Sequence, residues 1–242
     1  MSLVERPTGI GFDYGRTLVD FIRPDAAIAA AGETLEAELE LCNSKWHGTA
    51  GEFALALDQL VDQLIDQGQR ANRWREVDFQ ELHRMAMHHL LGSWPTDQLS
   101  ALVGVTLQRA WVEGVVPIEP AREVLSRLKE RGIRLALCSN APFPPRQMHE
   151  QLERFQLVGY FDAVLFSSEI GWRKPDLRIF VEMLKRLGVP ARSVWFIGDE
   201  WEADIEGATA AGMKAILAPG ARAPESGADQ LTVWSDLLAR LD

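Results

Sequence analysis

The chain has 242 residues and a formal net charge of −10, from 35 acidic and 25 basic side chains. A protein this acidic repels a phosphodiester backbone, so nucleic acid is not an expected partner. Cys42 and Cys138 are too few for a disulfide framework or a thiolate metal site. No apolar run approaches the roughly 20 residues that cross a bilayer, and the first residues lack a signal-peptide pattern. We therefore expect a cytoplasmic protein, a monomer or homodimer, that does not bind a membrane.

The first predicted element is a short buried strand that runs from Thr8 to Phe12 and ends at Asp13. The stretch that follows is predicted to be helical. Thr49 and Glu52 have the spacing of a capping box, and apolar residues then repeat at every third and fourth position. The four predicted helices are Pro24 to Leu41, the helix that begins after Thr49, Asp78 to Leu91, and Thr96 to Trp111.

After Pro117 short apolar strands alternate with helices. A helical stripe from Ala121 to Leu128 is followed by Gly132, the residue type that left-handed helix ends favour. The predicted strands are Ile133 to Cys138, Ala163 to Phe166, Val194 to Ile197 and Ala215 to Leu217. This alternation is typical of parallel strands joined by right-handed crossovers, with an α+β arrangement as the alternative.

The predicted fold class is α/β, a doubly wound parallel sheet with a small four-helix cap domain. Residues 1–20 and 116–242 are predicted to form the α/β core, and residues 21–115 the helical domain. Ligands bind at the carboxyl ends of the strands in open parallel sheets. A helical insertion after the first strand would therefore lie over such a site as a lid.

Four polar segments follow strand ends or precede helices. They are Asp13-Tyr-Gly15-Arg16-Thr, Ser139-Asn140, Trp-Arg-Lys174-Pro and Gly-Asp199-Glu-Trp-Glu-Ala-Asp204. Taken singly, each is typical of a turn, a helix cap or dipole compensation. In order and spacing, the four resemble the motifs of the haloacid dehalogenase-like superfamily. The resemblance covers residues 9–20 and 133–218, and it implies core strands in the order 5-4-1-2-3.

The resemblance implies a phosphatase that uses Mg²⁺ and hydrolyses a small phosphorylated metabolite through an aspartyl-phosphate on Asp13. A carboxylate is ionised at neutral pH and needs no separate base to attack phosphorus. By resemblance, Asp13, the carbonyl of Gly15 and Asp199 hold the ion. Asp204 would hold it directly, hold it through water, or orient Lys174.

The resemblance also implies how the phosphoryl group is held. Lys174 would neutralise the transferring group, and Ser139 would donate a hydrogen bond to its oxygens. Asn140 and Arg16 are further candidates for substrate binding. Lys45 and His47 lie in the segment 43–48, where relatives place a specificity loop, although solvated loop residues are the alternative for both.

Gly15 departs from the family pattern. Phosphatases of the family usually carry a second Asp there, which acts as acid on the leaving oxygen and then as base toward water. Glycine can do neither, and a positioned acid or base contributes about 10²–10⁴-fold. An activated substrate, an acid from the cap, or a water relay would compensate.

Other activities remain open as alternatives. A 2-haloacid dehalogenase would use Asp13 on carbon without a metal, but such enzymes usually have Tyr at the position of Gly15 and lack the pattern that joins Asp199 to Asp204. A phosphonate-cleaving relative would need Lys45, and a mutase would need the missing acid. A catalytically weak binding or regulatory relative fits the glycine, although the other motif residues are all present.

Overall fold

The computed structural model describes residues 6–42, 45–223 and 228–242 and divides into two compact units. Met1–Asp20, Pro117–Ala141 and Met148–Asp242 form the first, here called the α/β unit. Phe21–Val116 and Pro142–Gln147 form the second, the helical unit. The sequence had placed residues 142–147 in the α/β core. Their grouping with the helices has a physical reason, because Phe143 packs edge-on against Phe79 with ring centroids 5.3 Å apart.

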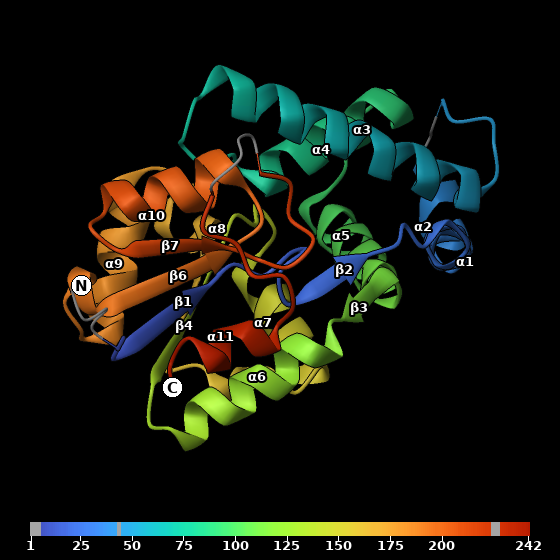
Figure 1. The fold of residues 1–242 in the computed structure, drawn as a ribbon. Helices are drawn as coiled ribbons and strands as arrows, with labels where there is room; N and C mark the ends of the chain where they lie inside the picture. The colour runs from blue at the N-terminus through green and yellow to red at the C-terminus, as the bar shows by residue number, and fades with distance from the viewer. Residues whose placement is uncertain (1–5, 43–44, 224–227) are drawn as a thin grey trace. The chain divides into compact units, whose positions relative to one another are not determined.

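A parallel sheet forms the centre of the α/β unit. Its strands are β1 (Gly9–Phe12), β4 (Arg134–Ser139), β5 (Ala163–Phe166), β6 (Val194–Gly198) and β7 (Lys214–Leu217). In the described part of the chain the order is β5-β4-β1-β6-β7, with every neighbouring pair parallel. Figure 1 shows β1 between β4 and β6. The predicted α/β class is confirmed. When the five strands of this sheet are numbered 1 to 5 in chain order and read from the β7 edge, their order is 5-4-1-2-3, as predicted.

Helices cover both faces of this sheet. They are α6 (Glu119–Glu130), α7 (Pro145–Arg154), α8 (Ser167–Ile170), α9 (Leu177–Leu187), α10 (Gly207–Ala210) and α11 (Ser235–Ala239), with the 3₁₀ turns η2 (Val158–Tyr160) and η3 (Ala191–Ser193) and the π-helical turn η4 (Trp201–Glu206). In Figure 1, α9 and α10 lie on one face, and α6 and α11 on the other. On α9, Ile179, Phe180 and Met183 are fully buried. Each such burial stabilises the fold by about 1.5–3 kcal/mol.

The helical unit has its own apolar core. It contains α1 (Asp25–Glu33), α2 (Glu36–Glu40), α3 (Ala50–Ala71), α4 (Phe79–Leu91), α5 (Asp97–Trp111) and the 3₁₀ turn η1 (Val112–Gly114). The predicted capping box is present at α3, where Thr49 Oγ1 accepts from the Glu52 amide and the Glu52 carboxylate accepts from the Thr49 amide. No helix among the described residues combines the length and the apolar character that a membrane crossing requires.

The first predicted helix, Pro24 to Leu41, is divided in two. Thr34 Oγ1 donates to the Ala31 carbonyl at 2.7 Å, and the Leu35 amide donates to the Gly32 carbonyl at 2.8 Å. These bonds to the third preceding residue tighten the turn and end α1. The helical unit therefore has five helices among its described residues, rather than the four that the sequence predicts.

A two-stranded ribbon lies where the chain passes between the units. It consists of β2 (Val19–Phe21) and β3 (Val115–Pro117). The boundary between the units falls within β2 on the outward path and within β3 on the return. The sequence did not predict this ribbon, because three residues are too few for a periodic pattern.

Candidate active site

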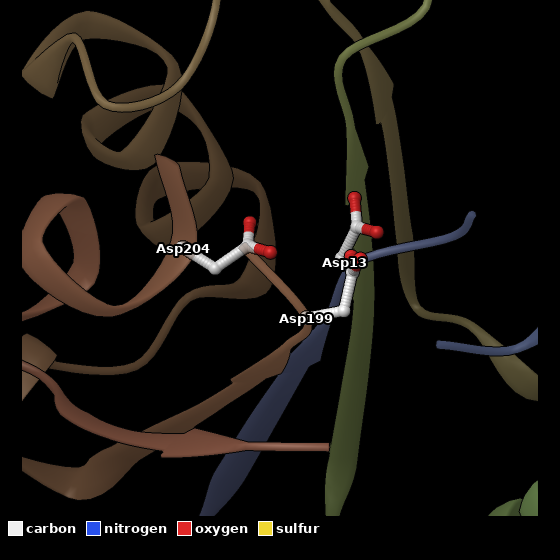
Figure 2. Close-up of side chains that lie close together, drawn as sticks. All are labelled: Asp13, Asp199 and Asp204. Atoms are coloured by element: carbon white, nitrogen blue, oxygen red, sulfur yellow. The ribbon is translucent and has the colours of Figure 1, made fainter. Parts of the chain in front are cut away.

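Two aspartates follow directly on neighbouring strands, Asp13 after β1 and Asp199 after β6. These strands pair in register with Phe12 opposite Ile197, and the Asp13 amide extends the ladder by donating to the Ile197 carbonyl at 2.8 Å. Both aspartates therefore leave the sheet at the same edge. Ligand oxygens of Asp13, Asp199 and Asp204 all lie within 4.8 Å of one another. Figure 2 shows the Asp204 carboxylate directed toward the other two.

Asp204 reaches this group from the turn η4. Its amide donates to the Glu200 carbonyl at 2.9 Å, and its Oδ2 accepts from the Glu200 amide at 3.1 Å. The close approach depends on Gly198, the last residue of β6. A Cβ atom at residue 198 would collide with the Asp204 carboxylate. Glycine is thus needed at the strand end because the carboxylate lies against its backbone.

Lys174 links two of the three carboxylates. Its side chain is 2% exposed, and Nζ lies 2.5 Å from Asp13 Oδ1 and 2.7 Å from Asp204 Oδ1. Lys174 precedes α9, which begins after the capping residue Asp176. The ammonium group holds the Asp13 carboxylate in one orientation by a charge-assisted hydrogen bond.

Asn140, which follows β4, fixes the backbone of Lys174. Its Oδ1 accepts from the Lys174 amide at 2.8 Å, and its Nδ2 donates to the Lys174 carbonyl at 3.1 Å. The sequence predicted Asn140 as a substrate-binding residue and did not reveal this pairing, since nothing in the sequence indicates that residues 34 positions apart meet. Ser139, the last residue of β4, is buried and lies at the same edge of the sheet as Asp13.

The charges of this group are not balanced. Among the described residues, three clustered carboxylates share one buried ammonium group. Burial, together with the charge of Asp204, raises the pKa of Asp13 to about 7, although Lys174 opposes the shift. Burial and the charge of Asp204 also raise the pKa of Asp199 to about 6. Burial disfavours the charged form of Lys174, but Asp13 and Asp204 outweigh it and raise its pKa, so the amine stays protonated.

This carboxylate cluster fits a divalent cation. Carboxylate oxygens are hard donors of the kind that Mg²⁺ prefers, and a second positive centre would relieve the repulsion that raises the pKa values of Asp13 and Asp199. The two oxygens of Asp204 contact Lys174 Nζ and the Glu200 amide. The contact with Lys174 is compatible with orientation of that side chain, while Asp204 also belongs to the group of carboxylates that could hold a metal ion, so its role stays a prediction.

The segment after Asp13 turns sharply. Gly15 forms a bridge with Val19, and the Arg16 amide donates to the Val19 carbonyl at 2.6 Å. Arg16 has a φ of 54°, in the left-handed region, and its side chain is exposed. The positive charge of Arg16 opposes the rise in the pKa of Asp199, so Arg16 belongs to the electrostatic environment of the cluster.

The predicted residues of the specificity loop belong to the helical unit. Lys45 and His47 are both exposed, and the Lys45 amide donates to the Leu91 carbonyl at 2.9 Å. The neighbouring Asn43 and Ser44 lie outside the described residues. Substrate binding by Lys45 and His47 stays a prediction.

Comparison with known proteins places the chain in a family. A sequence model described as "Haloacid dehalogenase-like hydrolase" matches residues 105–218. A ribulose-1,5-bisphosphate 5-phosphatase of Halopiger xanaduensis is 30% identical over 210 residues, which cover 87% of this chain and 84% of that protein. The chain belongs to the haloacid dehalogenase-like hydrolase family. The expected family membership is confirmed, and with it the assignment as a hydrolase.

Further proteins are similar to this chain over different lengths. A glyceraldehyde 3-phosphate phosphatase of Methanothermobacter thermautotrophicus is 42% identical over 102 residues, which cover 42% of this chain and 44% of that protein, so the match spans less than half of its length. The crystal structure of a 2-haloacid dehalogenase from Pseudomonas syringae pv. Tomato superposes with a TM-score of 0.68 at 22% identity and covers 96% of both chains. At this identity, the superposition establishes the shared fold.

Proposed function

We propose that the protein is a Mg²⁺-dependent phosphatase that hydrolyses a small phosphorylated metabolite through an aspartyl-phosphate on Asp13. The observation that carries this proposal is the meeting of Asp13, Asp199 and Asp204 at one edge of the sheet, with Lys174 between two of them. The names of the relatives, phosphatases of ribulose-1,5-bisphosphate and of glyceraldehyde 3-phosphate, support phosphoryl transfer.

Asp13, Asp199 and the carbonyl of Gly15 would hold Mg²⁺. When bound, the ion offsets the repulsion between an attacking carboxylate and a phosphate group. Asp204 orients Lys174, because both of its oxygens already contact protein groups. Lys174 in turn holds Asp13 and offsets negative charge on the transferring group.

The reaction then proceeds in two displacements at phosphorus. An oxygen of Asp13 attacks phosphorus, a new oxygen–phosphorus bond forms, and the bond to the ester oxygen breaks. The leaving oxygen departs with the bonding electron pair and takes up a proton from solvent water. Water next attacks the phosphorus of the aspartyl-phosphate, which releases inorganic phosphate and restores the Asp13 carboxylate. Ser139, at the end of β4, donates to a phosphoryl oxygen in both displacements.

Gly15 limits the range of leaving groups. The side chain that usually protonates the leaving oxygen is missing, so turnover depends on how well the alcohol leaves as an anion or on a proton from another source. We infer that the helical unit acts as a cap and that Lys45 and His47, exposed within it, contribute to substrate selection. We also propose a cytoplasmic location, where small phosphorylated metabolites occur.

The test is phosphate release from p-nitrophenyl phosphate and from a panel of sugar and nucleotide monophosphates, with Mg²⁺ and with EDTA. A parallel reaction contains 2-chloropropionate. Mg²⁺-dependent phosphate release supports the proposal. Chloride release from 2-chloropropionate in EDTA, without phosphate release in either condition, would replace it with a dehalogenase.

Two variants connect the activity to the cluster. Asp13→Asn removes the nucleophile and is expected to abolish turnover. Asp20→Asn is the matched control, because Asp20 is an exposed acidic residue of the same segment and lies outside the cluster. Acid-quenched wild-type protein is expected to carry phosphate on the peptide that contains Asp13. Turnover above a trace in Asp13→Asn contradicts the assigned nucleophile.

A further inference from the structure

The helical unit contains a cavity of about 30 Å³, and none of the residues that line it belongs to the carboxylate cluster. It is lined by side chains of α3, α4 and α5 and by Phe143. Phe79, Phe143 and Trp111 supply aromatic surface, and Phe79 also stacks on His83 with ring centroids 5.8 Å apart. All of these residues lie within the one unit. The α/β unit therefore contributes no residue to the lining of the cavity.

His83 lines this cavity, and one of its ring nitrogens is buried without a partner among the described residues. It is 5% exposed, and its Nδ1 lies 3.5 Å from Ser100 Oγ. Its Nε2 is buried and has no hydrogen-bond partner within the part of the chain that the structure describes. Burial lowers the pKa of His83 to about 4, so the ring is neutral at pH 7. Nε2 carries the lone pair in the tautomer in which Nδ1–H donates to Ser100 Oγ, and the proposed ligand requires this tautomer. A buried polar atom without a partner is destabilising, and a ligand in the cavity would supply one.

Gly104 keeps the space beside the imidazole open. It lies inside α5, where glycine is less stable than alanine. Its backbone does not have the positive φ that favours glycine, and an added Cβ would lie 3.7 Å from His83 Cε1, an ordinary contact. Neither the backbone nor the packing therefore requires glycine at residue 104. Glycine at residue 104 leaves the space beside the His83 ring unfilled.

The wall formed by α3 is acidic. Arg23 forms ion pairs with Asp25 and Asp58, each at 2.6 Å, and with Asp62 at 3.5 Å. Three carboxylates thus share one guanidinium group among the described residues. Asp58 is also engaged by Trp111, whose Nε1 donates to Oδ1 at 2.5 Å. Asp62 is the less engaged of the two cavity residues, and its side chain is 52% exposed. Partial burial together with the charge of Asp58 raises its pKa to about 6. An additional cation at this wall would favour its ionised form.

We infer that this cavity binds a small organic cation, a primary ammonium group on a short carbon chain. The ammonium group donates to the Asp62 carboxylate and to His83 Nε2, and the carbon chain packs against Phe79 and Phe143. Aromatic faces attract cations, and carboxylates repel anionic ligands, so charge selects an amine over a carboxylic acid. The space beside Gly104 admits the chain. None of these residues belongs to the proposed phosphatase site.

The test uses n-propylammonium chloride and the full-length protein at pH 7.5. Binding is followed by calorimetry and by the ¹⁵N chemical shift of His83 Nε2. We expect saturable binding of n-propylammonium, at least tenfold weaker binding of propan-1-ol, and no binding of propionate. A change in the Nε2 shift on binding identifies His83 as the acceptor. Equal affinity for the alcohol and the ammonium ion would overturn the inference.

Three variants test the residues. His83→Phe keeps an aromatic ring in the stack but removes the acceptor, and Asp62→Asn removes the charge, so each is expected to weaken n-propylammonium binding at least tenfold. Gly104→Ala narrows the cavity and should weaken binding similarly while it raises the melting temperature, which keeps the test valid if His83→Phe does not fold. The matched control is Asp66→Asn, an exposed residue of α3 outside the cavity. Unchanged affinity in folded Gly104→Ala would refute the site.

A free amine and a phosphorylated substrate with an amino group both carry the ammonium group that the cavity is proposed to bind. If n-propylammonium raises the KM of a phosphate ester without changing kcat, the cavity takes part of the substrate. If it leaves KM unchanged while calorimetry shows saturable binding, the ligand is a separate molecule. Binding to Asp13→Asn should equal that of the wild type. The failure of this inference is therefore distinguishable from the failure of the proposed phosphatase.

Discussion

Without metal, the carboxylate cluster should make the protein less stable as the pH rises. In the folded protein the pKa of Asp13 is about 7 and that of Asp199 about 6, whereas the ordinary value is 3.8. Between the ordinary and the raised value, the folded state retains protons that the unfolded chain has lost. The unfolded state therefore binds fewer protons, and the free energy of unfolding decreases with pH across the window from about 4 to 7.

The size of this effect follows from the pKa of Asp13. A difference of roughly three pH units corresponds to about 4 kcal/mol, at about 1.4 kcal/mol per unit. Asp199 adds less, because it is only partly buried and solvent screens its charge. Lys174 does not alter the slope, since its raised pKa stabilises the protein throughout the range below about 10 and the effect is lost only above it.

The assay is urea unfolding in EDTA at several pH values between 4 and 7.5, for the wild type and for Asp13→Asn. The variant resembles permanently protonated Asp13. We expect the wild type to lose about 4 kcal/mol more than the variant across this range. Saturating Mg²⁺ should flatten the wild-type profile, because a bound cation favours the ionised carboxylates. Equal pH dependence of the two proteins in EDTA would refute the assigned charge imbalance.

Three further substitutions test the site. Lys174→Met breaks a buried ion pair and should reduce stability by about 3–5 kcal/mol at pH 7 and abolish turnover; urea unfolding that shows little loss at this pH would contradict the pairing. Asn140→Ala releases the Lys174 backbone and should lower kcat by about tenfold while Mg²⁺ affinity stays within twofold, since about 1–1.5 kcal/mol of hydrogen bonding is lost; an unchanged kcat would leave the pairing without a catalytic effect. Gly15→Asp should raise turnover of alkyl phosphates by up to about 10²-fold, with little change for p-nitrophenyl phosphate; unchanged alkyl phosphate turnover with Mg²⁺ bound would count against the missing acid.

Local sequence patterns predicted most of the fold. The strand Ala163–Phe166 has the predicted ends, and the predicted capping box at Thr49 begins α3. The break between α1 and α2 could not be predicted in this way, because the alanine-rich sequence favours a continuous helix. Packing contributes to it, since an added Cβ at Gly32 would collide with the backbone of Ala50, a contact between segments 18 residues apart. Tertiary contacts of this kind leave no periodic signal.

The candidate site was predictable to the extent that it depends on strand order. Once β1 and β6 are neighbours, Asp13 and Asp199 must leave the sheet side by side. The sequence left three roles open for Asp204, and only its 2.7 Å distance from Lys174 Nζ favours one of them. Asn140 followed a predicted strand, but its partner depends on the path of a loop. Side-chain pairing across loops is therefore the part that required coordinates.

The position of Lys174 depends on three segments at once. Asn140, after β4, holds its backbone, while Asp13 after β1 and Asp204 in η4 hold its ammonium group. These segments share one sheet through β1, β4 and β6, so the register of the strands determines the distance between the lysine and the proposed nucleophile. Charged groups fixed in this way need little rearrangement when negative charge develops on a transferring phosphoryl group. A shift of β4 relative to β1 would thus impair the chemistry even if every residue of the site were retained.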